Sequence, residues 1–264
     1  MTDSLSPLRI MVVGASRGIG FEVARDLAPA GHKLWLAASS EKIHETTRAF
    51  APGTRATRVD VADADSVASL FSEIRRDWNG LDAVIHAAAE LGQVGNFWQL
   101  DPQRFVRTLE VNTAGSFFVA RAFTQLWLNA PVPSSSRRGK IVLFAGGGGG
   151  YGYPQFLPYG TSKAADVRMC ETMAMELDAA KLPIDINIVA PGANDTAMLA
   201  AVRAAGGEVR TMVPFAKPIA LCRWLLSPES DGVSGRFLHV NDDYPGLEPQ
   251  SLRAEAFKLR RIDA

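Results

Sequence analysis

The chain has 264 residues, and 47% of them are hydrophobic, which is enough to build a large buried core in one α/β domain. Its 28 basic and 28 acidic residues cancel and form no basic stripe, which argues against a nucleic-acid-binding surface. No apolar run reaches membrane-spanning length, and residues 1–9 lack the apolar core of a signal peptide. We therefore expect a soluble cytoplasmic protein without a membrane partner.

Apolar runs and helical patterns alternate along the chain. The runs predict strands at 9–13, 33–38, 54–59, 83–86, 140–145, 185–190 and 236–240. Consecutive apolar residues such as Ile141 to Phe144 are typical of strands buried on both faces of a parallel sheet. Between the third and fourth runs, apolar residues repeat at helical spacing, and Asp63 or Asp65 can cap that helix. The pattern predicts one Rossmann-like domain over residues 1–264, a doubly wound parallel sheet of about seven strands flanked by helices.

A glycine-rich loop joins the first predicted strand to a helix-like segment. Gly14 allows a tight turn, Gly18 lets backbone N–H groups approach a pyrophosphate, and Gly20 lets the helix pack against the strand. The N-terminus of that helix presents its positive dipole end to the phosphates. The loop predicts a dinucleotide site at the carboxyl ends of the strands.

Tyr159 and Lys163 lie four residues apart at the start of a helix-like segment that runs to about Ala179. Residues four apart share one face of a helix, so the phenol and the ammonium point to the same place. A neighbouring ammonium lowers the pKa of a phenol from its ordinary value of about 10. The pair therefore predicts a general acid for a carbonyl oxygen, or a base in the reverse direction.

The cysteines and histidines predict no metal site. Cys170 and Cys222 lie far apart in apolar, helix-like stretches, which predicts two buried thiols. The four histidines, His32, His44, His86 and His239, form no ligand cluster.

With its motifs in this order, the chain resembles the short-chain dehydrogenase/reductases in their single-domain form, from Ile10 to about Tyr244. The resemblance implies an NAD(P)-dependent enzyme of the EC 1.1.1 type that acts on a small-molecule carbonyl/alcohol pair. It assigns cofactor binding to Gly14, Ser16, Arg17, Gly18, Ile19, Gly20, Asp60, Val61, Ala87, Ala88, Tyr159, Lys163, Pro191, Gly192 and Thr196.

The resemblance also implies roles for three catalytic residues. Tyr159 exchanges the hydroxyl proton, and Lys163 lowers the pKa of Tyr159 and holds the nicotinamide ribose. Asn112 positions a water molecule that links Lys163 to solvent.

The end of the second strand favours NADP(H) over NAD(H). NAD-binding members place an acidic residue there, whereas this strand ends in Ser39 and Ser40, with no acid before Glu41. The two serines can donate to a 2′-phosphate, and Arg17 can supply the positive charge. Arg17 could alternatively be a plain surface charge.

The chain departs from the family where the catalytic serine is usual, because Gly146 stands there at the start of the run Gly146–Gly150. Three interpretations stay open. Backbone N–H groups of the run could act as oxyanion donors, a hydroxyl of Tyr151 or Tyr153 could substitute, or reductase chemistry could be lost. The glycine-for-serine exchange marks a branch of the family, and the run predicts open space beside Tyr159 for a bulky ring or a sugar.

At two further departures from the family's pattern we expect a structural role. His86 stands where the family usually has the first residue of Asn-Asn-Ala-Gly, and we expect a hydrogen-bonded polar group at a strand end. Asp242 and Asp243 are expected to form a solvated turn instead of a cation site.

Residues outside the motifs give predictions about substrate binding and about assembly. Residues 197–215 could be a lid over the site or a helical surface excursion. Apolar residues that could line the substrate pocket are Leu91, Trp98, Tyr151, Tyr153, Phe156, Met198, Leu199, Met212 and Phe215. In the family, the helix that starts at Tyr159 packs against a symmetry mate, and tails such as 245–264 often reach a neighbouring subunit, so a homo-oligomer, dimer or tetramer, is expected.

Two other functions remain as alternatives. One is a Tyr/Lys-dependent epimerase or dehydratase that keeps its nucleotide bound. The other is a catalytically inactive dinucleotide-binding sensor or partner protein, which the missing serine suggests. Retention of Asn112, Tyr159 and Lys163 together argues against an inactive protein.

Overall fold

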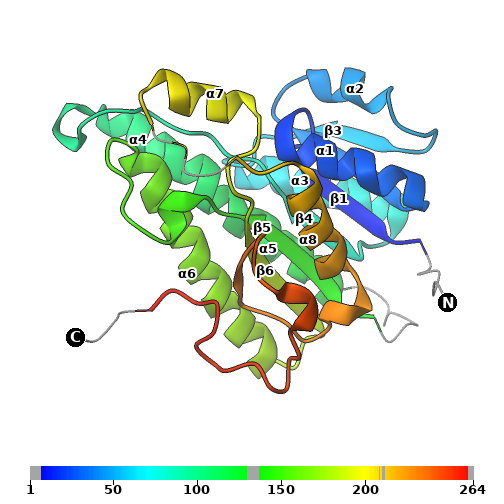
Figure 1. Cartoon of the computed structure of the whole chain (residues 1–264). Helices are drawn as coiled ribbons and strands as arrows, with labels where there is room; N and C mark the ends of the chain where they lie inside the picture. Colours follow the sequence, from blue (N-terminus) through cyan, green and yellow to red (C-terminus); the bar gives the residue numbers. More distant parts are fainter. Residues whose placement is uncertain (1–6, 130–136, 208, 210–211, 261–264) are drawn as a thin grey trace.

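The computed structural model describes residues 7–129, 137–207, 209 and 212–260. Within these residues, seven strands form one sheet in the order β3-β2-β1-β4-β5-β6-β7, and every neighbouring pair is parallel (Figure 1). The strands are β1 (Arg9–Val13), β2 (Lys33–Ala38), β3 (Arg55–Arg58), β4 (Ala83–His86), β5 (Gly139–Phe144), β6 (Ile184–Ala190) and β7 (Phe237–His239). The predicted doubly wound sheet is confirmed, and each predicted strand ends within one residue of the observed one.

Helices cover both faces of this sheet (Figure 1). They are α1 (Gly18–Leu27), α2 (Lys42–Thr47), α3 (Ala64–Trp78), α4 (Pro102–Leu109), α5 (Gly115–Leu128), α6 (Leu157–Ala179), α7 (Ala197–Ala204) and α8 (Ala216–Leu226). Helix α3 begins as predicted, because the Asp63 side chain accepts a hydrogen bond from the Asp65 N–H.

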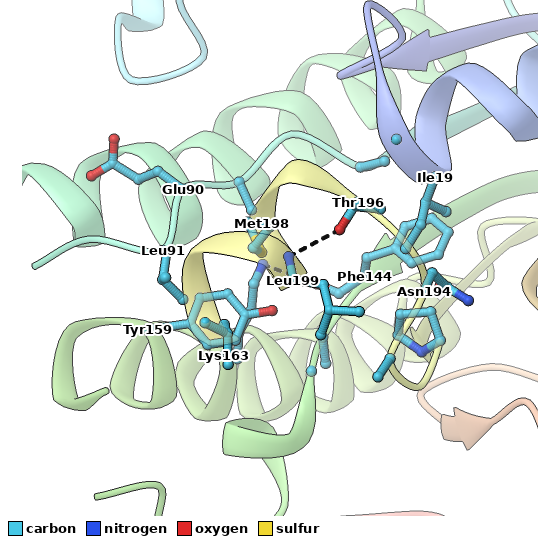
Figure 2. A pocket seen from close by; sticks show the side chains of 18 of the residues that line it. Ile19, Glu90, Leu91, Phe144, Tyr159, Lys163, Asn194, Thr196, Met198 and Leu199 are labelled. Atoms are coloured by element: carbon cyan, nitrogen blue, oxygen red, sulfur yellow. Dashed lines mark hydrogen bonds between the residues drawn. The ribbon is translucent and has the colours of Figure 1, made fainter. Parts of the chain in front are cut away.

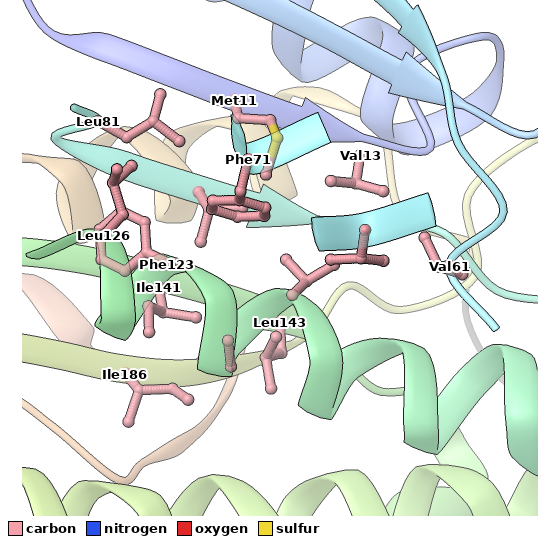
Figure 3. Close-up of a cluster of buried hydrophobic side chains, with 14 of the residues drawn as sticks. Met11, Val13, Val61, Phe71, Leu81, Phe123, Leu126, Ile141, Leu143 and Ile186 are labelled. Carbon is pink, nitrogen blue, oxygen red and sulfur yellow. The ribbon is translucent and has the colours of Figure 1, made fainter. Parts of the chain in front are cut away.

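The core forms two layers, one on each face of the sheet. In β1, Met11 and Val13 belong to the cluster under α3, α5 and α6, and Ile10 and Val12 belong to the cluster under α1 and α8. Figure 3 shows the first of these clusters, with helix side chains packed onto the strands. Because both faces are covered, the strands are apolar at consecutive positions, which is the pattern that made them recognisable in the sequence.

The strand order creates a crevice at the carboxyl ends of the strands. From β1 the chain builds outward through β2 and β3 on one side, then crosses back to place β4 on the other side. Helices that follow β1 and β4 therefore diverge, and a crevice opens beyond the carboxyl ends of these two strands. Val13 and His86, which end β1 and β4, are neighbours in the sheet register at that point.

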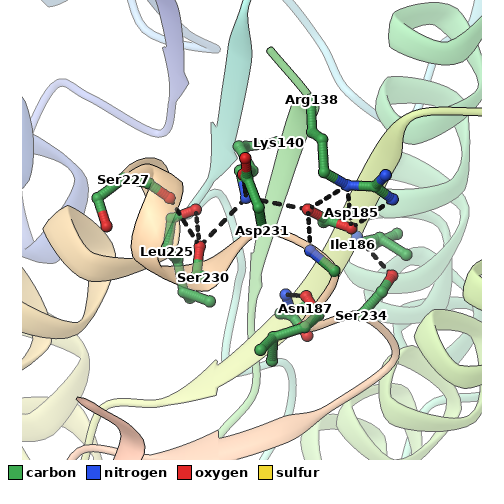
Figure 4. Close-up of polar contacts among 12 residues, drawn as sticks. Arg138, Lys140, Asp185, Ile186, Asn187, Leu225, Ser227, Ser230, Asp231 and Ser234 are labelled. Carbon is green, nitrogen blue, oxygen red and sulfur yellow. Dashed lines mark hydrogen bonds and ion pairs between the residues drawn. The ribbon is translucent and has the colours of Figure 1, made fainter. Parts of the chain in front are cut away.

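A buried ion pair closes the opposite end of the sheet (Figure 4). Lys140 Nζ on β5 lies 2.9 Å from Asp185 Oδ2 on β6, and both side chains are buried. Arg138 and the Gly232 N–H also donate to the Asp185 carboxylate, and Ser230 accepts from Lys140. This cluster lies at the amino ends of the strands, away from the crevice, so its role is structural.

We expect Asp185→Asn to lower the free energy of unfolding by about 3 kcal/mol, because it leaves the buried Lys140 ammonium without its deepest counter-charge. Urea denaturation would measure the loss. The matched control is Asp178→Asn, an exposed aspartate on α6, which should change stability by less than about 0.5 kcal/mol. Equal losses in the two variants would show that the buried pair contributes no more to the free energy of unfolding than an exposed aspartate does.

The C-terminal segment folds back onto its own chain along β7 and α6 (Figure 1). The Phe237 N–H donates to the Phe257 carbonyl at 2.7 Å, and the Leu259 N–H donates to the buried Glu171 carboxylate at 2.6 Å. An Arg236 N–H also reaches three carbonyl groups between residues 253 and 256. Up to residue 260, the segment that we had expected to reach a neighbouring subunit is held within this one; residues 261–264 lie outside the described residues.

Across the described residues, no helix combines the length and apolarity needed to cross a bilayer. The same residues contain no group of three or more histidine, cysteine, aspartate or glutamate side chains arranged to hold a metal ion. Cys170 and Cys222 are buried, as predicted, and burial raises the pKa of both thiols, that of Cys222 to about 12.

Candidate active site

A cleft of about 1330 Å³ opens at the carboxyl ends of the strands, where the crevice was expected. Fifteen of the predicted site residues line it: Gly14, Ser16, Arg17, Gly18, Ile19, Ser39, Asp60, Val61, Ala87, Ala88, Tyr159, Lys163, Pro191, Gly192 and Thr196. Gly20, Ser40 and Asn112 do not line the cleft. The fold therefore gathers on one surface residues that lie as far apart in the chain as Gly14 and Thr196.

The glycine loop after β1 forms a tight cradle at one end of the cleft. Gly14 has φ +83°, and a Cβ there would lie 2.6 Å from the Ala88 backbone nitrogen. A Cβ at Gly20 would lie 2.5 Å from the Gly14 carbonyl oxygen, so the start of α1 is pressed against the loop. Arg17 is the N-cap of α1 and makes no side-chain cap, which leaves the first N–H groups of the helix for an anion. This cradle fits a pyrophosphate.

Asp60 lies at the rim of the cleft and is paired with an arginine that the sequence interpretation missed. Arg107 on α4 donates to the Asp60 carboxylate at 3.0 Å, and the Ala62 N–H donates to it at 3.0 Å. Although partial burial opposes ionisation, these two donors hold the pKa of Asp60 below its usual value. No sequence signal connects residues 60 and 107, because only the placement of α4 brings them together.

A second missed arginine lies at the end of β2. Arg58 ends β3 and is aligned with Ala38 in the sheet register, one residue before Ser39. Its Nε donates to the Ser39 carbonyl at 3.1 Å, and its Nη1 lies 3.3 Å from the Glu41 carboxylate. Ser39, Ser40 and Arg58 are all exposed, so this corner offers hydroxyl groups and a guanidinium to an anion. The register of β2 and β3, which the structure shows, is what places Arg58 beside Ser39.

Helix α6 presents Tyr159 and Lys163 to the cleft, across from Met198 and Leu199 (Figure 2). Lys163 is buried, and its Nζ donates to the Phe144 carbonyl and to Asp166 Oδ2, both at 2.9 Å. Since an ammonium has three N–H donors, one remains for another acceptor. Asp166 is a residue that the sequence interpretation did not consider.

The pKa of Tyr159 is raised above its ordinary value, mainly because burial disfavours the phenolate. The Lys163 ammonium opposes this shift, but the charges of Asp166 and Tyr153 add to it. Lys163 lowers the pKa of Tyr159, as predicted, but burial outweighs this effect, so the net shift is upward. Tyr159 is a protonated phenol at neutral pH.

Asn112 ties two sides of the site together behind the cleft. It lies in a π-helical turn (Glu110–Ala114) between α4 and α5 and is fully buried. Its side-chain oxygen accepts from the Glu90 N–H, and its amide donates to the Glu90 carbonyl and to Ser162 Oγ. Ser162 in turn donates to the Tyr159 carbonyl at 2.7 Å. Asn112 thus anchors the start of α6 to the loop that follows β4.

The glycine turn after β5 is packed against α6. A Cβ at Gly146 would lie 2.5 Å from the Tyr159 hydroxyl oxygen, and a Cβ at Gly148 would lie 2.6 Å from Gly160 Cα. The expected open space beside Tyr159 is therefore wrong at these two positions, because the tyrosine and its helix fill it. The Gly149 N–H already donates to the Gly146 carbonyl, which removes one of the proposed oxyanion donors.

His86 also differs from its prediction. It is 2% exposed at the end of β4, and neither ring nitrogen has a hydrogen-bond partner among the described residues. Burial, and then the charge of Lys163, lowers its pKa to about 3. His86 is therefore a neutral, unsatisfied group beneath the site instead of the hydrogen-bonded one expected.

Described residues of the segment 197–215 line the cleft, among them Met198, Leu199 and Val213; residues 208, 210 and 211 lie outside the described residues. The segment begins with α7, which Thr196 caps by accepting from the Leu199 N–H at 3.2 Å (Figure 2). Among the nine predicted pocket residues, six line the cleft: Leu91, Tyr151, Tyr153, Phe156, Met198 and Leu199. Trp98, Met212 and Phe215 do not line it, and Trp98 is largely exposed. The helical part of the segment is α7, Ala197–Ala204, and α7 residues line the cleft.

A parallel sheet with a glycine-loop cradle at its switch point defines an α/β protein of the dinucleotide-binding class. A family model described as short chain dehydrogenase matches residues 9–206. The chain belongs to the short-chain dehydrogenase/reductase family.

Two of the named relatives are reductases. The chain is 32% identical over 199 residues to a trihydroxynaphthalene reductase of Pestalotiopsis fici, a match that covers 73% of this chain and 66% of that protein, just under two thirds. It is also 32% identical over 198 residues to versicolorin reductase 1 of Aspergillus parasiticus, covering 73% of this chain and 71% of that protein.

Solved structures of low identity share the fold. A short-chain dehydrogenase from Salmonella enterica serovar Typhi superimposes with a TM-score of 0.79 at 24% identity, over 92% of this chain and 99% of that one. A chain from Escherichia coli CFT073, assigned to the short-chain dehydrogenases and solved with NADPH, gives the same TM-score and identity over 92% of this chain and 100% of that one.

Proposed function

We propose that the protein is an NADP(H)-dependent oxidoreductase of the EC 1.1.1 type that interconverts a carbonyl compound and its alcohol. The observation that carries the proposal is a single cleft with a pyrophosphate cradle at one end and the Tyr159–Lys163 pair at the other. Gly14 and Gly18 would hold the cofactor phosphates, with Gly20 packed behind them, and Pro191, Gly192 and Thr196 line the wall where the nicotinamide would lie.

When bound, the cofactor supplies the hydride that reduces the carbonyl carbon. Tyr159 Oη donates its proton to the carbonyl oxygen, so that the product is an alcohol and Tyr159 is left as a phenolate. Lys163 stabilises that phenolate and offers its remaining N–H to the ribose of the cofactor. A proton from solvent then restores the phenol. The Asn112 side chain is committed to Glu90 and Ser162, so its backbone carbonyl would be the group that positions the water for this step.

The glycine at position 146 does not remove the chemistry that the proposal needs. The hydroxyl groups of Tyr151 and Tyr153, which line the cleft, are candidates to orient the substrate carbonyl in place of a serine. Loss of one such donor elsewhere costs on the order of 10²–10³ in rate, which leaves a measurable reductase.

A fused-ring aromatic ketone is the substrate class that we favour. Tyr153 and Phe156 line the cleft as a stacked pair, with ring centroids 4.4 Å apart and an interplanar angle of 18°. Aromatic faces of this kind suit a flat ring compound. The names of the relatives, reductases of a trihydroxynaphthalene and of versicolorin, agree with this choice.

NADPH oxidation tests the proposed function. The panel would contain tetralone, a fused two-ring ketone, beside cyclohexanone and an open-chain ketone with the same number of carbons as tetralone. We expect turnover with all three ketones and the highest kcat/KM for tetralone. Turnover of open-chain ketones alone would overturn the substrate class, and NADPH binding without any turnover would favour the sensor alternative. A nucleotide that co-purifies and is not consumed would favour the epimerase or dehydratase.

The preference for NADP(H) depends on the corner formed by Arg17, Ser39, Ser40 and Arg58. We expect Arg58→Ala to raise the KM for NADPH by about tenfold or more, because a charge-assisted hydrogen bond to a phosphate contributes roughly 1.5–3 kcal/mol. The KM for NADH should stay within about twofold. Initial-rate kinetics with both cofactors would measure this, with the exposed Arg48→Ala as the control. A lower KM of the parent for NADH than for NADPH would overturn the preference.

We also infer that the chain forms a homo-oligomer, a dimer or a tetramer. Large apolar side chains are exposed on three neighbouring helices, namely Val106 on α4, Phe117 on α5 and Met175 on α6. Burial of such side chains against a second copy would remove apolar surface from water. Light scattering during gel filtration would test this, and a monomer at micromolar concentration would contradict it.

A further inference from the structure

We propose that Asp166 is a positioning residue that acts through Lys163: its carboxylate charge-pairs with the lysine, keeps Tyr159 protonated, and biases the site toward proton donation. The proposal rests on the proposed role of Tyr159 as the acid–base group. It concerns the pH range in which each direction of the reaction runs.

Asp166 is placed as the counter-ion of Lys163. Asp166 lies one helical turn after Lys163 on α6, with Oδ2 2.9 Å from the lysine Nζ. Its side chain is fully buried, and Oδ1 has no hydrogen-bond partner among the described residues. A carboxylate in this position is costly to bury unless it stays next to an opposite charge. Lys163 supplies that charge, so the two groups behave as one unit.

The groups around the pair leave its charge balance intact. From β4, His86 faces the same layer and is neutral above about pH 3, because burial lowers its pKa. Burial raises the pKa of the Asp166 carboxyl, and the Lys163 ammonium opposes this shift. From α5, the Ser116 hydroxyl donates to the Asn112 carbonyl. On α6 itself, burial raises the pKa of the Cys170 thiol, and Tyr153 from the preceding loop adds to the upward shift of the Tyr159 pKa.

The consequence for Tyr159 follows from the signs of the charges. A lone ammonium beneath the phenol would favour the phenolate, whereas an ammonium paired with a carboxylate favours it much less. The phenol therefore stays protonated through neutral pH and is ready to protonate a carbonyl oxygen. Oxidation of an alcohol needs the phenolate and is confined to more alkaline pH.

The test is Asp166→Asn, which keeps an oxygen acceptor for Lys163 but removes the negative charge. Tyrosine ionisation would be followed by ultraviolet absorbance, and subtraction of the Tyr159→Phe spectrum in each background isolates Tyr159. We expect the ionisation of Tyr159 to move to lower pH by about one unit or more, a tenfold change in its ionisation constant. The limb of the pH profile on which kcat/KM for alcohol oxidation rises with pH should move to lower pH by the same amount.

The matched control is Asp185→Asn, because Lys140–Asp185 is also a buried lysine–aspartate pair at 2.9 Å, at the other end of the sheet. It should lose stability without any change in Tyr159 ionisation. An unchanged titration in Asp166→Asn, or an equal shift in Asp185→Asn, would overturn the proposal.

A measurement on the parent protein covers the case in which Asp166→Asn does not fold. Carbon-13 NMR of labelled aspartate carboxyls, assigned through the backbone, should show Asp166 ionised at pH 7; a protonated carboxyl there would overturn the proposal. The titrations need no substrate, so they separate the two proposals. If the ionisation of Tyr159 shifts in Asp166→Asn but no ketone is turned over, only the proposed function is contradicted. If ketones are turned over but the ionisation of Tyr159 does not shift, only the role of Asp166 is contradicted.

Discussion

Tyr159→Phe should lower kcat for ketone reduction by about 10³-fold, within the range of 10²–10⁴ that a positioned general acid contributes. The phenyl ring keeps the packing against the Gly146 turn and loses only the hydroxyl that donates the proton. The dissociation constant for NADPH, measured by fluorescence, should stay within about threefold of the parent value, because the phosphate cradle at the other end of the cleft is untouched.

The control for this variant is Tyr244→Phe, a half-buried tyrosine that packs on Trp224 outside the cleft. It should retain most of the parent turnover. If Tyr159→Phe kept a tenth of the activity or more, the proton would have to come from another group, and the cleft tyrosines Tyr151 and Tyr153 would be the next to test.

Gly146→Ser should lower kcat/KM by about 10²-fold instead of restoring the family's usual arrangement. A Cβ at this position would lie 2.5 Å from the Tyr159 hydroxyl oxygen and 3.0 Å from the ring, closer than non-bonded atoms can approach. Either the turn or the tyrosine must move, and a displacement of about 1 Å is enough to cost 10²-fold in a catalytic site. Steady-state kinetics with tetralone and NADPH would measure the loss.

Gly152→Ser is the matched control, because nothing lies within 4 Å of a Cβ placed there. It should change kcat/KM by less than about threefold. A gain of activity in Gly146→Ser would contradict this prediction. It would show that the turn can open and that a serine at position 146 can orient the substrate carbonyl.

The fold was predictable because the sheet is buried on both faces. Each strand is then a run of consecutive apolar residues, as in Ile141 to Phe144, and these runs stand out between helical patterns. Strand ends were placed to within one residue, and a polar, glycine or proline residue directly follows every run except 83–86. The glycine loop and the pairing of Tyr159 with Lys163 depend on local geometry, which the sequence carries in full.

The electrostatics of the site were not predictable in the same way. Asp166 is visible three residues after Lys163, but its burial depends on how α6 packs beneath β4 and α5. Arg58 depends on the register of β2 and β3, and Arg107 on the placement of α4. The contact between Gly146 and Tyr159 depends on tenths of an ångström in the approach of α6 to the turn after β5. Such features follow from tertiary packing, which no local pattern encodes.

The interior position of β1 in the sheet, between β2 and β4, has a consequence for biosynthesis. One neighbour of β1 is β2, which follows soon after, but the other is β4, which is complete only when His86 has been made. At about 5–20 residues per second, one edge of this apolar strand stays unpaired on the ribosome for several seconds. An unpaired strand edge is a template for pairing with other chains. The strand order that opens the cleft therefore also sets the interval in which the nascent chain is most prone to aggregate.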